Sequence, residues 1–237
     1  MKQLLSFTLI TLLLAISSCS SAQTRRATDQ FEVSDFTAIE SSVVANIHIR
    51  QSSNTSVTAE GNEEMLNALD VRMENGKLIL DMDESFLKRF RKRSENLVIS
   101  ITTPNLTRID SEGVGNILID GTFTSPELIV QSEGVGNITA ENLRCQKVII
   151  DSEGVGNIDL GGTADNVEIS SEGVGNVDAD RLKAKRTVVS SEGVGNVSCY
   201  ASEYLKVESE SIGNVRYSGN PAKKELSKNG IGKIKAE

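Results

Sequence analysis

The chain has 237 residues, and 38% of them are hydrophobic, which is enough to build a buried core. Only 4% are aromatic and tryptophan is absent, so a core of large rings is excluded and Ile, Val and Leu must fill it. The net charge of −8 argues against a nucleic acid as partner, because binding phosphates needs a basic surface.

Residues 1–22 are predicted to be an export signal. Lys2 provides a basic start, residues 4–16 form an apolar run that is too short to span a membrane, and small residues follow. This segment indicates an exported protein of the cell envelope.

Residues 16–19, Ile-Ser-Ser-Cys, resemble a lipobox. In that interpretation residues 1–18 are a lipoprotein signal, and Cys19 carries a diacylglycerol that anchors the protein to the outer membrane without spanning it. The alternative is ordinary cleavage after Ala22, which also follows small residues. The residues after Cys19 leave both the periplasmic face and the cell surface open as locations.

Residues 30–108 show no repeat but are rich in predicted strands. Asn75-Gly76 is a strong hairpin signal between two short apolar segments. Strands are predicted at residues 43–50, 57–59, 71–73, 78–82 and 97–102, and a short helix at 63–69. No linker separates this part from the repeats that follow, so a single domain over residues 30–235 is expected.

The concentrated basic segment of the chain is residues 86–93, Phe-Leu-Lys-Arg-Phe-Arg-Lys-Arg. It is interpreted as a solvated loop or short helix whose Phe side chains pack inward. The alternative is a contact with acidic polysaccharide or lipid phosphate.

A hexapeptide, Ser-Glu-Gly-Val-Gly-Asn, repeats within residues 109–235. Five copies are followed by a variant and a worn last copy, and the seven begin at Ser111, Ser132, Ser152, Ser171, Ser191, Ser209 and Lys228. Their spacing of 18 to 21 residues is typical of a solenoid.

Between the hexapeptides, apolar and polar residues alternate, which indicates strands. An apolar pair follows each hexapeptide, as at Ile117 and Ile119, and another precedes the next one, as at Leu128 and Val130. Stacked coils pair such strands in parallel, and coils of about 20 residues have no room for a crossover helix. The predicted fold is all-β, a right-handed, single-stranded parallel β-helix.

The glycines and the Asn of the hexapeptide have structural explanations. Glycines on both sides of the Val are expected to allow positive φ at a tight corner, and the Asn side chains are expected to form a hydrogen-bonded ladder. The Val position is likewise assigned to coil geometry.

The Glu position has no such role, and its members are Glu112, Glu133, Glu153, Glu172, Glu192 and Glu210. Carboxylates about 4.8 Å apart repel one another, so this column must be solvated or bound to cations. A solvated acidic stripe is the favoured interpretation. The alternative is a calcium ladder, although one carboxylate per coil supplies few of the about six to eight oxygens that calcium takes.

In the last copy, Lys228, Asn229 and Lys233 replace Ser, Glu and Asn. Charged residues there would prevent end-to-end strand pairing, so this copy is interpreted as a terminal cap. A docking edge is the alternative. Cys145 and Cys199 lie three coils apart, too far for a disulfide, and are interpreted as small buried residues.

No catalytic constellation, cofactor motif or metal-binding spacing of His and Cys is present in the sequence. Pectate-lyase-like enzymes also form parallel β-helices, but their catalytic residues lie on long loops, whereas these coils have no insertions. The chain is therefore predicted not to be an enzyme, and a polysaccharide-lyase-like activity is only a remote alternative.

Gly-Val-Gly-Asn followed by Ile or Val, recurring about every twenty residues behind the segments 31–50 and 63–82, resembles the putative auto-transporter adhesin, head GIN domain family. The similarity covers about residues 30–235. It implies a β-helical envelope protein of Bacteroidetes-type bacteria and carries over no catalytic residues.

Together these observations predict a non-enzymatic adhesin-like or ligand-binding solenoid whose partner is a surface glycan or protein. The main alternative is a structural or assembly protein of the envelope without a specific ligand. No cofactor is expected, contact with a membrane is expected only through the lipid anchor, and the sequence indicates no particular oligomeric state. A function of the repeat is expected first along Glu112 to Glu210.

Overall fold

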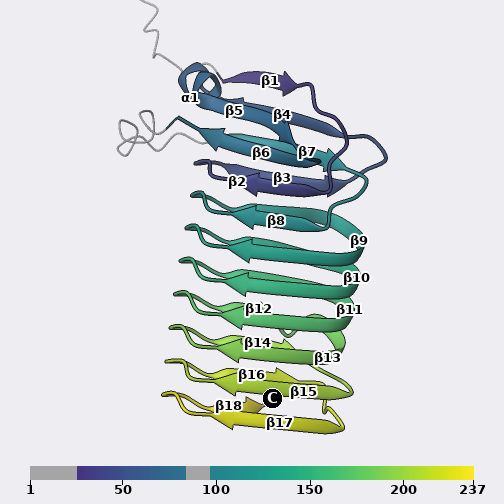
Figure 1. Ribbon diagram of the computed structural model, residues 1–237, viewed down its shortest axis with the longest axis vertical. Coiled ribbons are helices and arrows are strands. Elements are labelled where there is room, and N and C mark those ends of the chain that lie inside the picture. The colour runs from purple at the N-terminus through teal and green to yellow at the C-terminus, as the bar shows by residue number, and fades with distance from the viewer. Residues whose placement is uncertain (1–25, 84–96) are drawn as a thin grey trace, which may run out of the picture.

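Parallel strands of this chain stack into a column of coils (Figure 1). The computed structural model describes residues 26–83 and 97–237. The predicted export signal, Cys19 and the basic segment 86–93 lie outside these residues. Among the helices within them, none is long and apolar enough to cross a membrane. The prediction of a parallel β-helix is confirmed.

Each repeat forms one coil, with one strand after its hexapeptide and a second before the next. In the first coils the two strands are continuous through a bend, and in the later ones they are separate. Equivalent residues stack in register, so that Ile117 pairs with Ile138 and Ile138 with Ile158. The strands are β8 (Arg108–Ser111), β9 (Ile117–Ser132), β10 (Ile138–Ser152), β11 (Ile158–Ser171), β12 (Val177–Ala179), β13 (Leu182–Ser191), β14 (Val197–Tyr200), β15 (Tyr204–Ser209), β16 (Val215–Ser218), β17 (Lys223–Lys228) and β18 (Ile234–Ala236).

Ladders of aliphatic side chains fill the interior of the coils. The predicted inward residues on both strands of the first coil are buried, and so are their equivalents as far as Val215. Thr187 takes one inward position, and its hydroxyl donates to the backbone oxygen of Tyr200 at 2.6 Å, so no polar atom is left unpaired there. Phe123 is fully buried at the bend of β9.

Residues 38–51 form a further coil inside the part that was expected to be non-repetitive. β2 (Ala38–Ser41) pairs in parallel with β8, and β3 (Asn46–Gln51) pairs in parallel with β9. The turn between them, Ser-Ser-Val-Val-Ala-Asn, aligns with the first hexapeptide because Val44 bridges Val114. The sequence does not reveal this coil, since its turn has Val43 and Ala45 where the five identical hexapeptides have glycine.

Beyond this coil, the stack is closed by antiparallel strands and a helix (Figure 1). β6 (Lys77–Met82) and β7 (Val98–Thr103) still run parallel to β2 and β3. The outer strands are antiparallel, and they are β5 (Leu69–Glu74) on β6, β4 (Ser56–Gly61) on β7 and β1 (Ala27–Phe31) on β4.

Two local predictions in this end region are confirmed. The hairpin between β5 and β6 turns at Asn75 and Gly76, whose φ angles are 50° and 78°. The short helix is α1 (Glu63–Ala68), which begins where the Asn62 side chain accepts a hydrogen bond from the backbone N–H of Met65 at 2.7 Å. Its buried residues, Met65 and Leu66, join the hydrophobic core.

At the other end of the stack, β17 and β18 have open outer edges. Lys224, Leu226 and Lys228 take the positions of β17 that pair with buried residues of β15. Nζ of Lys228 donates to the carbonyl oxygens of Gly230 and Gly232 at 3.0 and 3.1 Å. Inward-pointing charges discourage another coil from stacking on this end, which supports the interpretation of the last copy as a cap.

Candidate functional site

The hexapeptides of successive coils lie above one another and form one long edge of the molecule, which we name the turn edge (Figure 1). Within the five identical hexapeptides Glu, Val and Asn alternate with glycine, and residues two apart in an extended segment point the same way. The turn edge therefore presents three outward columns. The Glu column is Glu112, Glu133, Glu153, Glu172, Glu192 and Glu210; the Val column is Val44, Val114, Val135, Val155, Val174, Val194, Ile212 and Ile231; the Asn column is Asn46, Asn116, Asn137, Asn157, Asn176, Asn196 and Asn214.

The glycines allow the turns of neighbouring coils to approach closely. A Cβ on Gly136 would lie 1.7 Å from the carbonyl oxygen of Gly115, and Gly136 has a φ of +153°. A Cβ on Gly134 would lie 2.2 Å from the carbonyl oxygen of Gly113, although Gly134 has no positive φ. The expectation of positive φ at both glycines is thus correct only for the second. At the first position the close approach of the neighbouring coil disfavours a side chain, although Ser211 takes this position in the sixth copy.

The Asn side chains form the predicted ladder. Oδ1 of Asn137 accepts hydrogen bonds from the backbone N–H and from Nδ2 of Asn157, at 3.1 and 3.0 Å. The same two bonds recur at every step from Asn46 to Asn214, one coil more than predicted. From Asn116 to Asn214, each Nδ2 donates one of its two hydrogens to the ladder, so the other can bind an outside acceptor.

The Glu column is an exposed line of like charges. All six side chains are exposed, and no ion pair in the described part of the chain includes any of them. The pKa of Glu153 is raised, most by the neighbouring Asp151 carboxylate, then by desolvation and by Glu133 and Glu172. Burial, followed by Glu172 and Glu133, also raises the pKa of Asp151. The carboxylates therefore destabilise one another's charged forms.

A metal site on the Glu column gains no support from the geometry. Within residues 26–83 and 97–237, no group of three or more His, Cys, Asp and Glu side chains is placed to hold a metal ion. The calcium ladder on this column stays a prediction.

The Val column is the feature that the sequence interpretation missed. Its exposed fraction is 37% at Val44, 48% to 56% at the next six members and 75% at Ile231. These eight account for all but two of the large exposed hydrophobic residues in the described chain. The available signal was position: Val lies two residues from Glu and two from Asn, so it shares their outward direction.

This arrangement suits binding rather than chemistry. Eight rungs about 4.8 Å apart give a straight apolar line roughly 34 Å long. Carboxylates border the line on one side and amides with spare N–H groups on the other. The turn edge is thus a surface with one apolar, one acidic and one hydrogen-bonding track.

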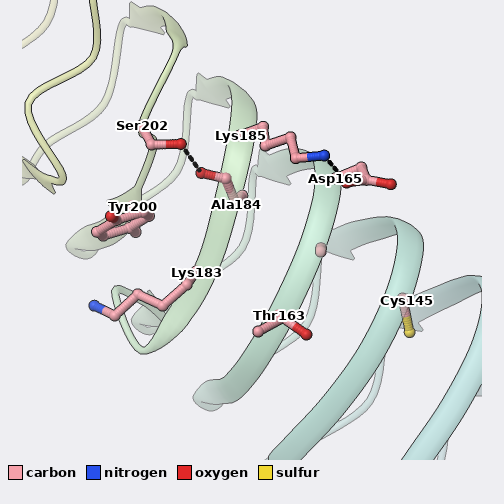
Figure 2. A pocket seen from close by; sticks show the side chains of 9 residues that line it. Cys145, Thr163, Asp165, Lys183, Ala184, Lys185, Tyr200 and Ser202 are labelled. Atoms are coloured by element: carbon pink, nitrogen blue, oxygen red, sulfur yellow. Dashed lines mark hydrogen bonds and ion pairs between the residues drawn. The ribbon is translucent and has the colours of Figure 1, made fainter.

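A second candidate is a shallow hollow at the opposite edge, where the coils bend (Figure 2). Its volume is about 320 Å³, and it is lined by Cys145, Thr163, Ala164, Asp165, Lys183, Ala184, Lys185, Tyr200 and Ser202. Its charged groups already have partners. Nζ of Lys185 lies 2.7 Å from Oδ1 of Asp165, and Nζ of Lys183 lies 4.3 Å from the ring centre of Tyr200.

The hollow also offers no activated nucleophile. Cys145 is half-buried there rather than fully buried as expected, and burial raises the pKa of its thiol, which stays protonated at neutral pH. Cys199 is buried as expected, and neither of these cysteines forms a disulfide. The turn edge is therefore the stronger candidate for function.

Comparisons with known proteins agree with this architecture. A family model described as putative auto-transporter adhesin, head GIN domain matches residues 35–221. The chain is 34% identical to a putative adhesin from Bacteroides fragilis of known crystal structure, with a TM-score of 0.83, covering 90% of this chain and 97% of that one.

More distant structures share the fold. A putative lipid binding protein from Parabacteroides distasonis is 19% identical, with a TM-score of 0.67 and coverage of 90% of this chain and 97% of that one. A putative adhesin from the same species is 16% identical, with a TM-score of 0.63 and coverage of 91% and 98%. No curated protein matches the chain.

Proposed function

Because this chain belongs to the putative auto-transporter adhesin, head GIN domain family, we propose that it is an adhesin-like, non-enzymatic protein of the cell envelope that binds a surface glycan or protein through its turn edge. The similarity to a putative adhesin over nearly the whole chain supports the class of protein. The exposed Val column supports the place of binding.

The Val column carries the proposal because coil stacking does not require it. The side chains point to solvent, and a Thr or Ser at the same position would keep the backbone bridge between coils. Covering half-exposed Val and Ile side chains with a partner would contribute roughly 1 kcal/mol per rung. A line of such rungs is expected on a surface that is covered in use.

The alternative is a structural or assembly protein of the envelope with no specific ligand. Such a protein would need the Gly and Asn positions for its coils, but it would have no use for apolar side chains on the outside. The Val column therefore favours a binding role.

We further propose that the protein is exported and attached to the outer membrane through a lipid on Cys19. The described chain begins at the end closed by α1, so this end would face the membrane and the turn edge would extend away from it. Replacement Cys19→Ala should release the protein from the membrane fraction. Unmodified Cys19 in the mass spectrum of the native protein would contradict the anchor.

The binding role is tested with the mature chain and a triple variant, Val135→Thr, Val155→Thr and Val174→Thr. Thr has the shape and the strand preference of Val, so the coils should stay intact. On a glycan array and in pull-downs from cell-surface extracts, the triple variant should lose at least about tenfold in affinity for whatever the unchanged chain binds.

The matched control is Val188→Thr, which replaces an exposed valine on a flat face of the coils, 38% exposed. It should bind like the unchanged chain, and circular dichroism should show equal folding for all variants. Equal binding by the triple variant would remove the turn edge from the proposal. Protease treatment of intact cells separates the alternatives further, because a chain that is hidden from protease on intact cells cannot directly contact another cell.

A further inference from the structure

We infer that the partner of the turn edge is a cationic polypeptide segment, whose apolar side chains pack on the Val column while its Lys or Arg side chains pair with the Glu column. This inference rests on the proposed function and narrows its partner from a surface glycan or protein to one class. It follows from the three tracks of the turn edge taken together.

The acidic track selects a positive partner. Its six carboxylates are exposed and have no ion-pair partner in the described chain, whereas several nearby acidic groups do. Asp110 contacts Arg108 at 2.7 Å, and Glu208 contacts Lys206 at 2.9 Å. Cations therefore pair with some acidic groups beside the turn edge, such as Asp110 and Glu208, but with no member of the Glu column in the described chain.

Mutual repulsion within this track strengthens the selection. The pKa of Glu153 is raised most by the Asp151 carboxylate, then by desolvation, Glu133 and Glu172. Burial, and after it Glu172 and Glu133, raises the pKa of Asp151 beside the column. A cation placed along the column relieves several repulsions at once. Anionic membranes and acidic glycans would add to the repulsion and are disfavoured for the same reason.

The apolar track excludes a purely electrostatic partner. The Val column runs directly beside the Glu column, two residues away in every hexapeptide. A partner that is only cationic would leave the half-exposed Val side chains uncovered. A segment that carries apolar and basic side chains on the same face would satisfy both columns along the same line.

The Asn track fits a polypeptide backbone. Its side chains are fixed by the ladder, and each keeps one Nδ2 hydrogen for an outside acceptor. Backbone carbonyl oxygens are acceptors of this kind. A second copy of this chain is a poorer occupant, because two turn edges would bring twelve carboxylates together, six from each Glu column.

Three synthetic twelve-residue peptides test the inference, with repeated Lys-Lys-Val-Val, Lys-Lys-Ser-Ser and Glu-Glu-Val-Val, so that each face of the extended Lys-Val peptide carries both kinds of side chain. Fluorescence anisotropy with the mature chain at physiological salt should show the Lys-Val peptide binding at least about tenfold more tightly than either of the others. Equal binding of the Lys-Ser peptide, or tighter binding of the Glu-Val peptide, would overturn the partner class.

Variants of the chain locate the interaction. The triple replacement Glu133→Gln, Glu153→Gln and Glu172→Gln should weaken Lys-Val binding at least about tenfold, as should the Val135, Val155 and Val174 to Thr variant. The control Glu127→Gln, Glu141→Gln and Glu203→Gln removes the same charge near the bends and should leave binding unchanged. If both Glu variants weaken binding equally, the Glu column is not the site.

The experiments distinguish failure of the inferred partner class from failure of the proposed function. If the native cell-surface partner is lost with the Val variant but the Lys-Val peptide neither binds nor competes, the partner class is wrong and the function stands. If the peptide binds but the triple Val variant binds the native cell-surface partner as tightly as the unchanged chain does, the proposed function is wrong. A dimer in light scattering that the Val variant abolishes would show a second copy as occupant and overturn the inference.

Discussion

Gly136 shows how strongly single positions of the hexapeptide are constrained. Its missing Cβ makes room for the carbonyl oxygen of Gly115 in the preceding coil, and its φ of +153° is one that side-chain-bearing residues rarely adopt. Gly121 differs, because it has a positive φ of +78° but a Cβ added to it would meet nothing within 4 Å. Substitution of Gly121 would therefore introduce backbone strain alone, whereas substitution of Gly136 would introduce backbone strain together with a steric clash.

The replacement Gly136→Ala should lower the free energy of unfolding by roughly 4 kcal/mol or more, because a coil must move to admit the methyl group. Gly121→Ala should cost only about 1 to 2 kcal/mol, the ordinary cost of a side chain at positive φ. Urea unfolding followed by circular dichroism measures both. Equal losses would mean that close approach between the turns adds nothing.

Asp151 makes a pH-dependent prediction. Burial and the Glu column raise its pKa in the folded chain, so its charged form is less favourable there than in the unfolded chain. This destabilisation is present above the raised pKa and disappears as the pH falls through it. Asp151→Asn should therefore increase the melting temperature at about pH 7 and leave it unchanged at about pH 3.

The control for this measurement is Glu141→Gln, which removes an exposed carboxylate at the bend edge. It should not reproduce the gain at neutral pH. A lower melting temperature of Asp151→Asn at neutral pH would show that the carboxylate stabilises the coil instead.

At the scale of elements, alternation of apolar residues was enough to place the repeat strands and their inward sides. The rule holds because each strand has one buried face, so a shift by one residue would expose Ile117 and Ile119 together. It could not reveal the coil at residues 38–51, because Val43 and Ala45 replace the glycines that define the motif. Val114 and its equivalents were also misinterpreted. Apolar side chains are normally counted as core, so the sequence pattern assigned them a structural role in the coil, whereas they are exposed.

The open end of the stack depends on two inward-pointing lysines of β17. We expect Lys224→Leu with Lys228→Ser to produce concentration-dependent association, because the last coil would then resemble an inner one with free strand edges. Size-exclusion chromatography with light scattering measures the mass. Lys223→Leu with Lys235→Ser removes two charges from outward positions and should leave the mass unchanged. A double inward variant that keeps the mass of the unchanged chain would show that other features protect this end.

For the whole molecule, each coil contacts chiefly the coil above and the coil below. Stability should then be close to a sum of coil terms and interfaces between neighbours, as in other repeat proteins. Residues 152–170 make one complete coil, from the start of one hexapeptide to the residue before the next. Removing them joins Asp151 to Ser171, which reproduces the native order of Asp151 followed by Ser152.

Deletion of residues 152–170 should therefore give a folded protein with a β-rich circular dichroism spectrum, cooperative unfolding and a turn edge one rung shorter. Deletion of residues 152–161 removes about half a coil, so every later strand would meet the wrong partner, and this variant should not fold. Thermal melts of the two variants decide the matter. If the whole-coil deletion unfolds like the half-coil one, the coils depend on particular neighbours rather than on a common register, and the turn edge could not be lengthened or shortened without loss of the fold.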